Sequence, residues 1–310
     1  MKIIITGGAS FLGQRLAQAL LTSQEFPDFK ELYLIDVIPP VRPTADRRVR
    51  CQVADLAAPG TIEALLYQPV DILFHLAAIG YQQTAADFEF GIKINFDATR
   101  QILEASRRAL KPCTLILTSS TAVGSATVTD ATALHPHSAF GTQKALSELL
   151  IKDYSRRGLI DGRIVRLPLL RLEPASGQEH ITTFLAPLIQ NLLANKEVSW
   201  PIDPRLPLWL ASTHAIVNNL LHSALLPSSS WGDQRVVTLP GITTTSHSLI
   251  ETLKQRMTRD SLPLIHYAVD ESLNAILAGQ PSQFERSPAE ALGFRGDRSL
   301  SELFSCFFES

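Results

Sequence analysis

The first fourteen residues, MKIIITGGASFLGQ (residues 1–14), determine the fold class. Residues 2–6 are a short run rich in isoleucine, which is typical of a strand buried on both faces. Gly7 and Gly8 end this run, and from Phe11 the apolar residues recur at helical spacing. A strand, a glycine turn and a helix in this order direct backbone N–H groups and the positive end of a helix dipole at a phosphate.

Two glycines of this turn match part of a dinucleotide-binding motif. Gly7 and Gly13 are spaced as in the TGxxGxxG variant, where the first allows a tight turn and the last allows helix and strand to pack closely. The middle position is Ser10, whose hydroxyl can donate to a phosphate but whose side chain adds bulk. Because a single glycine motif is weak evidence, a turn that binds no ligand remains the alternative.

An acid at the end of the next strand favours NAD as the ligand. Residues 31–37 (ELYLIDV) predict a second buried strand, and Asp36 lies near its carboxyl end. A carboxylate there can accept hydrogen bonds from both hydroxyls of the adenosine ribose and would repel a 2′-phosphate. No arginine follows before Arg42, so the sequence favours NAD over NADP. The alternative is an acid that only caps a turn.

Composition excludes several classes of partner. The chain has 310 residues and a formal net charge of −2, which argues against nucleic acid or an anionic membrane as a partner. Its longest apolar runs are too short to span a bilayer, and it begins directly in a predicted strand, so we expect no signal peptide. Cys51, Cys113 and Cys306 are scattered without a CxxC pair, which favours a reducing compartment, the cytoplasm, and predicts no metal site.

Strand and helix patterns alternate along the first half of the chain. Further strands are predicted at residues 49–53, 71–78 and 115–118, with helices at residues 59–67, 84–110 and up to residue 157. This alternation requires right-handed crossovers and predicts an α/β fold with a doubly wound parallel (Rossmann) sheet. We expect an NAD-binding domain over residues 1–166 and a smaller C-terminal substrate lobe over residues 167–310, part of which can return to the sheet.

Polar residues follow several of the predicted strands. Asp55 follows the third strand, where with Leu56 it would lie near an adenine or simply cap the next helix. His75 lies in an apolar run and is interpreted as a core histidine, whereas Asn95 sits among apolar neighbours and needs hydrogen-bond partners. The hydroxyl cluster at residues 118–121 ends the fifth strand, where such folds place their chemistry, with turn formation as the alternative.

Phe140 and Lys144 lie at positions i and i+4 of a predicted helix and therefore share one face. Together with the features above, they resemble an extended short-chain dehydrogenase/reductase, of the NAD-dependent epimerase/dehydratase family. The matching features are the glycine turn, Asp36, the HLAA of residues 75–78, Asn95, the Ser119–Ser120 pair and the aromatic-x-x-x-Lys helix. The resemblance covers about residues 1–225. Residues 141–168 are similar to the branch of nucleoside-diphosphate-sugar epimerases that includes D-erythronate dehydrogenase.

The resemblance implies an oxidoreductase or epimerase that acts on a hydroxyl or carbonyl group of a small, sugar-acid-like substrate. In this family Ser120 would hydrogen-bond the substrate oxygen, and Lys144 would hold the nicotinamide ribose and lower the pKa of a catalytic tyrosine. The family also implies a homodimer that pairs helices at residues 90–110 and 140–157. The residues expected to contact NAD are Gly7, Ser10, Phe11, Leu12, Gly13, Asp36, Asp55, Leu56, Leu76, Ala77, Ala78, Asn95, Lys144 and Leu167.

The sequence departs from the family where the catalytic tyrosine should stand, because that position is Phe140. Phenylalanine cannot transfer a proton, and a general acid or base typically contributes about 10²–10⁴-fold to the rate. Phe140 is either an engineered change or natural divergence. Further departures favour divergence: Ser10, Gly124 in place of an aromatic residue, His214 in place of arginine, and residues 171–180, which lack the branch's Pro-Gly-x-Pro-Asn pattern.

Two questions follow from Phe140. One is whether another group supplies the proton, and the candidates are Tyr81, His137 and Thr121. The other is whether the chain has changed function, either to a non-redox isomerase, dehydratase or cyclase, or to a cofactor-binding protein without turnover. The loss of an arginine at His214 also weakens the case for a substrate that carries a carboxylate.

Overall fold

The computed structural model describes residues 1–27, 29–109, 111–124, 133–168, 170–172, 184–256 and 264–308. The chain forms two compact units that interleave along the sequence. Unit 1 comprises Met1–Val123, Pro136–Leu167 and Val217–Val237, and unit 2 comprises Gly124–His135, Pro168–Ile216 and Thr238–Ser310.

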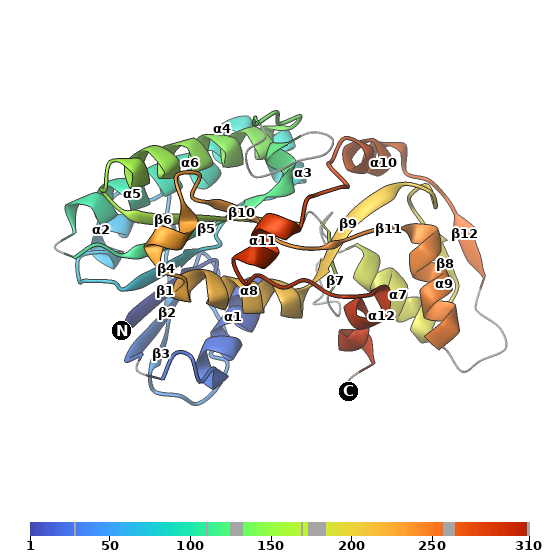
Figure 1. Cartoon of the computed structure of the whole chain (residues 1–310), viewed down its shortest axis with the longest axis horizontal. Helices are drawn as coiled ribbons and strands as arrows, with labels where there is room; N and C mark the ends of the chain where they lie inside the picture. The colour runs from blue at the N-terminus through green and yellow to red at the C-terminus, as the bar shows by residue number, and fades with distance from the viewer. Residues whose placement is uncertain are drawn as a thin grey trace. The chain divides into compact units, whose positions relative to one another are not determined.

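A seven-stranded sheet forms the centre of unit 1, in the order β10-β6-β5-β4-β1-β2-β3 (Figure 1). Its strands are β1 (Lys2–Thr6), β2 (Glu31–Asp36), β3 (Val49–Val53), β4 (Ile72–His75), β5 (Thr114–Ser120), β6 (Asp161–Leu167) and β10 (Val236–Thr238). The pairs from β6 to β3 are all parallel. The strand order reverses between β1 and β4, which is the switch point where such sheets bind ligands. The predicted doubly wound fold is confirmed.

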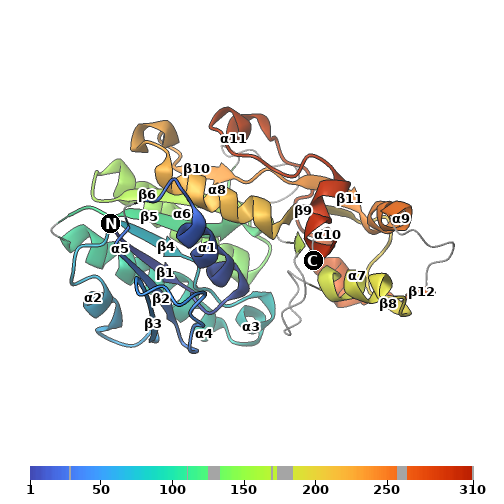
Figure 2. The ribbon, with the colours of Figure 1, turned by 90° about the horizontal axis from the view of Figure 1, so that it is seen from below.

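Helices cover both faces of this sheet (Figure 2). Helix α1 (Phe11–Thr22) packs on β1 and β2, on the same face as the Val217–Leu225 part of α8 (Thr213–Leu225). The other face carries α2 (Thr61–Leu65), α5 (Ala98–Arg108) and α6 (Ala139–Arg156). Apolar residues of these three helices bury themselves against the strands: Ile62, Ala98, Ile102, Leu103 and Ile151 pack with Ile4, Leu73, Leu115, Leu117 and Ile164.

The single helix predicted over residues 84–110 is wrong. The chain instead forms α3 (Tyr81–Ala86), α4 (Phe88–Ile92), the π-helical segment η1 (Lys93–Asp97) and then α5. Asp87 ends α3 and caps α4, because its carboxylate accepts a hydrogen bond from Phe90 N–H (2.9 Å). The π-helical turn surrounds Asn95, whose side chain is bound elsewhere in the fold, as described below. Such turns are common at functional sites.

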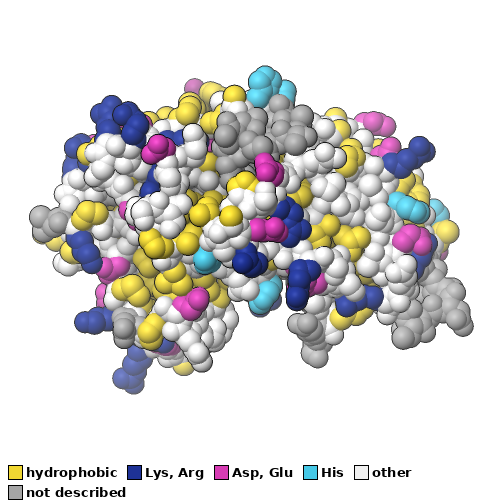
Figure 3. All heavy atoms as spheres, in the orientation of Figure 1, with side chains coloured by type: hydrophobic (Ala, Val, Ile, Leu, Met, Phe, Trp, Pro, Cys, Tyr) yellow, Lys and Arg dark blue, Asp and Glu magenta, His cyan; other side chains and the backbone are white. Residues whose placement is uncertain are grey.

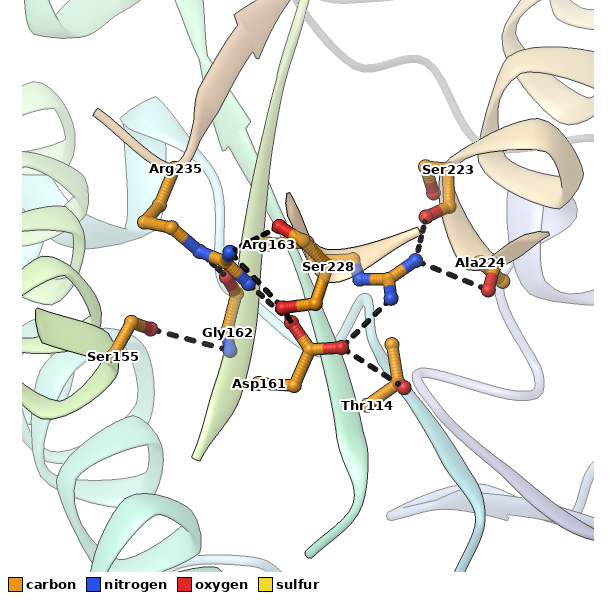
Figure 4. Close-up of polar contacts among 9 residues, drawn as sticks. All are labelled: Thr114, Ser155, Asp161, Gly162, Arg163, Ser223, Ala224, Ser228 and Arg235. Carbon is orange, nitrogen blue, oxygen red and sulfur yellow. Dashed lines mark hydrogen bonds and ion pairs between the residues drawn. The ribbon is translucent and has the colours of Figure 1, made fainter. Parts of the chain in front are cut away.

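A cluster around Asp161 joins the late part of unit 1 to β6, at the opposite end of that strand from Leu167 (Figure 4). The Asp161 carboxylate binds the guanidinium groups of Arg163 (2.7 Å) and Arg235. Arg163 also donates to the carbonyl groups of Ser223 (2.6 Å) and Ala224 (3.1 Å), and so satisfies the carboxyl end of α8. Burial alone would raise the pKa of Asp161, but these hydrogen bonds and charges outweigh it and lower the pKa.

Unit 2 contains two small sheets and several short helices. Strands β7 (Leu170–Leu172), β9 (Pro207–Ser212) and β11 (Ile242–Thr245) form one sheet, and β8 (Val198–Trp200) pairs with β12 (Ile265–Tyr267). The helices are α7 (Leu185–Leu193), the start of α8, α9 (Ser246–Arg256), α10 (Glu271–Ala278), α11 (Ser287–Ala291) and α12 (Leu300–Leu303). Trp209 of β9 stacks on Phe284 with ring centroids 4.9 Å apart. Buried Asp297 accepts hydrogen bonds from the backbone and hydroxyl of Ser212 (2.8 and 2.6 Å).

On the face drawn in Figure 3, basic, acidic and apolar side chains are scattered over the surface. Among the described residues on that face, the basic side chains do not form one continuous stripe of the kind that nucleic-acid-binding proteins use. In the described part of the chain, every helix is too short or too polar to cross a membrane.

Candidate active site

The glycine turn between β1 and α1 is tightly packed. Gly7 has a φ of +74°, and a Cβ atom there would lie 2.8 Å from the backbone nitrogen of Ala77. A Cβ atom on Gly13 would lie 2.3 Å from the carbonyl oxygen of Gly7. These two positions therefore require glycine, as the motif predicts, and the turn brings the end of β4 against the end of β1.

Ser10 is the N-cap of α1. Its hydroxyl oxygen accepts a hydrogen bond from Gly13 N–H (3.0 Å) and its hydroxyl donates to the carbonyl oxygen of Gly7 (2.6 Å). The hydroxyl hydrogen is thus engaged inside the turn rather than directed at a phosphate. The side chain is accommodated because Ser10 has an ordinary extended backbone, with a φ of −65°. The N–H groups of Phe11 and Leu12, in the first turn of the helix, have no intrahelical acceptor and are the donors that remain.

Asp36 is fixed to the glycine turn. Its carboxylate accepts hydrogen bonds from Ala9 N–H (2.9 Å) and Val37 N–H (2.8 Å). Asp55, in contrast, is exposed and accepts a hydrogen bond from Ala57 N–H (2.9 Å), which closes a turn. Helix α2 begins only at Thr61, with Gly60 as its N-cap, so Asp55 caps this turn and not the helix. Leu56 beside it is 7% exposed.

Asn95 connects the loop after β4 to helix α6. Its side chain accepts from Ile79 N–H (2.9 Å) and donates both to the carbonyl oxygen of Ile79 (3.0 Å) and to Oε1 of Gln143 (2.8 Å). Leu76, Ala77 and Ala78 belong to the same loop. Asn95 therefore holds this loop against the helix that carries Lys144. The amide next to the lysine, Gln143, was not predicted, and its position inside the polar stretch GTQK offers no distinguishing signal.

His75 is a core histidine, as interpreted from the sequence. It is 1% exposed, with Nδ1 2.7 Å from Thr6 Oγ1 and Nε2 3.0 Å from Thr99 Oγ1. Because the Thr99 hydroxyl donates to the carbonyl oxygen of Asn95 (3.1 Å), Nε2 is the ring nitrogen that carries the hydrogen. Burial, with a smaller contribution from the charge of Lys144, lowers the pKa of His75 to about 3. A neutral ring with both nitrogens engaged does not serve as a catalytic base.

Lys144 and Ser120 lie at the carboxyl end of β5. Lys144 is 3% exposed, and its ammonium donates to the carbonyl oxygen of Thr118 (3.0 Å). Burial lowers the pKa of Lys144 to about 8, although the nearby carboxylate of Glu148 acts in the opposite direction. Ser120 Oγ accepts from Ala122 N–H (3.2 Å), and Ser120 pairs in register with Leu167 on the neighbouring strand.

A buried ion pair between Glu148 and Arg166 lies beside this end of β5, and it was not predicted from the sequence. Glu148 is fully buried, and its carboxylate accepts from Ser119 Oγ (2.6 Å) and from Arg166 Nε and Nη2 (2.9 and 2.8 Å). Glu148 stands one helical turn after Lys144, and that i+4 spacing was the available signal.

Phe140 occupies the predicted tyrosine position between two other groups. Its ring lies 5.0 Å from the ring of Tyr81, centroid to centroid, and 5.9 Å from the Lys144 nitrogen. Of the other candidates for the missing acid, Thr121 is buried and makes no hydrogen bond within the described residues, and His137 is exposed. His214 is exposed in the first turn of α8, in unit 2, and residues 173–180 of the departing segment lie outside the described residues.

Comparisons with known proteins identify the family of this chain. Residues 3–206 match the NAD dependent epimerase/dehydratase family. A D-erythronate dehydrogenase from Haemophilus influenzae is 38% identical over 313 aligned residues, which cover 100% of this chain and 99% of the relative. A second D-erythronate dehydrogenase, from Cupriavidus necator, is 35% identical and is covered over 98% of its length, again with 100% of this chain.

The crystal structure of a nucleoside-diphosphate-sugar epimerase from Agrobacterium tumefaciens is 32% identical, with a TM-score of 0.92 over 100% of this chain and 94% of that one. An L-threonine dehydrogenase from Cupriavidus necator shares the fold at a TM-score of 0.88 over the whole of both chains, with 18% identity. The chain therefore belongs to the NAD-dependent epimerase/dehydratase family and is an enzyme that uses NAD, as the sequence predicts.

Proposed function

We propose that this enzyme oxidises a hydroxyl group of a small polyhydroxy acid, D-erythronate or a close analogue, with NAD as the hydride acceptor. The observation that carries the proposal is the buried ammonium of Lys144, which is bound to the Thr118 carbonyl near the end of β5, the strand that ends in Ser120. The two full-length relatives, both D-erythronate dehydrogenases, support the substrate class.

The residues at the switch point of the sheet fit NAD. The glycine turn leaves no room for a Cβ atom at Gly7 or Gly13, and the first turn of α1 offers N–H groups to a pyrophosphate. The Asp36 carboxylate uses one hydrogen bond on each oxygen, so both oxygens retain a lone pair for the ribose hydroxyls. Lys144 would hold the ribose at the nicotinamide end.

When bound, NAD accepts a hydride at its nicotinamide ring. Ser120 would orient the substrate, because its oxygen already accepts from Ala122 N–H and its hydrogen is left to donate to the substrate oxygen. The positive charge of Lys144 would stabilise negative charge that develops on that oxygen as its proton leaves. A pKa of about 8 keeps most of this lysine protonated at neutral pH.

The test is NADH formation, followed by its absorbance, with D-erythronate, related sugar acids and the corresponding neutral polyols. Calorimetric titration with NAD and NADP accompanies it. We expect NAD to bind more tightly than NADP, and one sugar acid to be oxidised with a kcat at least tenfold lower in Ser120→Ala than in the wild type. Binding of NAD without oxidation of any polyol or sugar acid would refute the dehydrogenase and favour the non-redox alternative.

We also propose a homodimer formed through α4 and α6, which contact each other. The apolar residues of the predicted interface divide into two groups: Leu103 and Ile151 are in the core, whereas Leu146 and Leu149 are 37% and 55% exposed. Phe88 and Phe90 on α4 extend this exposed apolar surface, at 60% and 44%. We expect light scattering to give a dimer at micromolar concentration and Leu149→Glu to give a monomer, and a wild-type monomer would contradict the proposal.

A further inference from the structure

Tyr81 brings a phenol ring against Phe140, the residue at the position of the family's missing tyrosine. It is the first residue of α3 and follows the loop of residues 76–80, which Asn95 holds in place through Ile79. Its ring packs on Phe140, and its hydroxyl oxygen is buried. The Phe140 ring in turn lies 5.9 Å from the Lys144 nitrogen. The phenol, the phenyl ring and the ammonium therefore form one cluster, entirely within unit 1.

We propose that Tyr81 is the catalytic acid and base of this enzyme, in place of the hydroxyl that Phe140 lacks. The proposal rests on the proposed dehydrogenase function. In the oxidation, the substrate O–H bond breaks and its proton passes to the Tyr81 phenolate, while a C=O bond forms. The hydride leaves the same carbon with its electron pair to oxidised nicotinamide, so that the products are a carbonyl compound, NADH and a neutral tyrosine. In the reduction, the phenol returns this proton.

The other titratable groups near the cluster do not suit this role. His75 is neutral with both ring nitrogens bound, and its pKa is about 3. Lys144 already donates to Thr118, and Thr121 carries an aliphatic hydroxyl, which is a far weaker acid than a phenol. Of the other tyrosines in unit 1, Tyr33 lies under Lys2, Tyr67 is 84% exposed and Tyr154 binds Glu104.

Phe140 has a role in this arrangement. The phenyl ring packs against the Tyr81 ring and lies under the Lys144 ammonium, so it presents an apolar surface to both groups. In buried surroundings, a lysine charge in the same cluster as a phenol favours its phenolate form. The aromatic side chain is therefore retained at position 140, although the hydroxyl has moved to a neighbouring helix.

The test compares Tyr81→Phe with Tyr67→Phe, a control on the exposed surface of the same unit. We expect Tyr81→Phe to lower kcat by about 10²–10⁴-fold, with NAD affinity within threefold of the wild type, and the control to leave both unchanged. The ring and its packing on Phe140 are preserved, so the fold is not at risk. Tyr81→Phe with Phe140→Tyr in the same chain should recover most of the lost rate, because the hydroxyl returns to the helix of Lys144. A kcat for Tyr81→Phe within threefold of the wild type would overturn the proposal.

A second readout does not depend on turnover. Phenolate absorbance that disappears in Tyr81→Phe should develop at a lower pH in the wild-type protein than in Lys144→Met. If this phenolate absorbance developed at the same pH in the wild type and in Lys144→Met, the proposal would be overturned. If the wild type oxidises no substrate, the proposed function fails, and this titration alone then supports or overturns the pairing of Tyr81 with Lys144.

Discussion

Replacing Lys144 with methionine should make the protein more stable at neutral pH while it abolishes turnover. Burial lowers the pKa of Lys144 from 10.5 to about 8, which corresponds to a penalty of roughly 3 kcal/mol for keeping this ammonium charged in the fold. Methionine has a similar length and removes the charge. The carbonyl oxygen of Thr118 loses its donor, at a cost of about 1 kcal/mol, so we expect a net gain of about 2 kcal/mol at pH 7.

The sign of the pH dependence makes this prediction specific. Between pH 8 and 10.5 the unfolded lysine binds a proton that the folded lysine has lost, so the stability of the wild type rises with pH over that range. The Lys144→Met variant lacks this increase. Its advantage over the wild type should therefore shrink by roughly 3 kcal/mol between pH 7 and pH 10.5.

Urea unfolding, followed by circular dichroism at both pH values, measures these differences. Lys152→Met is the matched control, because Lys152 lies on the same helix in a half-buried position and donates to a neutral amide, that of Gln234, at 3.4 Å. The control should change stability by no more than about 0.5 kcal/mol at pH 7. A Lys144→Met variant that is less stable than the wild type by the same amount at both pH values would refute the argument.

Three further predictions concern a buried neutral histidine, a buried ion pair and the cofactor. Because the pKa of His75 is about 3, the protein should lose about 3 kcal/mol of stability between pH 7 and pH 4.5, and His75→Asn, measured by urea unfolding, should show no such loss. Glu148→Gln should destabilise the fold by about 3–5 kcal/mol in the same assay, because it leaves Arg166 charged and buried. Glu290→Gln, in the partly exposed Arg286–Glu290 pair, should cost at most about 1 kcal/mol. If the two substitutions had equal effects, the Glu148–Arg166 pair would not behave as a buried ion pair. Asp36→Ala should weaken NADH binding by about 10–100-fold in a fluorescence titration, and should reduce the ratio of the NADH affinity to the NADPH affinity. An unchanged ratio would contradict the role of this acid.

The sequence predicted the parts of the fold that local pattern determines. Strands β1 and β3 have the predicted bounds, and the glycine turn packs as its spacing requires. The break at Asp87 and the π-helical turn at Asn95 were missed, because the apolar spacing on either side continues without interruption. What distorts the helix is a set of bonds to Ile79 and to Gln143, which lies 48 residues away in the sequence.

The sequence was enough to predict which residues belong to the candidate site, but not which contacts their side chains make. Ser10 was expected near a phosphate, and its bonds to Gly7 and Gly13 depend on a rotamer that spacing does not specify. Tyr81 could be named only as one of several possible acids, since its stacking on Phe140 joins elements that are far apart in sequence. In unit 2 the sheet of β7, β9 and β11 was missed for the same reason, because its short strands pair across long separations.

The Asp161 cluster constrains the order in which the chain can fold during synthesis. During synthesis, residues 168–216, which belong to the other unit, are made before the carboxyl end of α8 and Arg235. Until then, Asp161 and Arg163 bind each other at the edge of an unfinished sheet, without the carbonyl groups and the second guanidinium that complete their hydrogen bonds in the native fold. A protein truncated after β6 would lack these later partners permanently. Unit 1 is thus a discontinuous folding unit. To produce it without unit 2, residues 217–237 would have to be joined directly after Leu167 or added as a separate peptide.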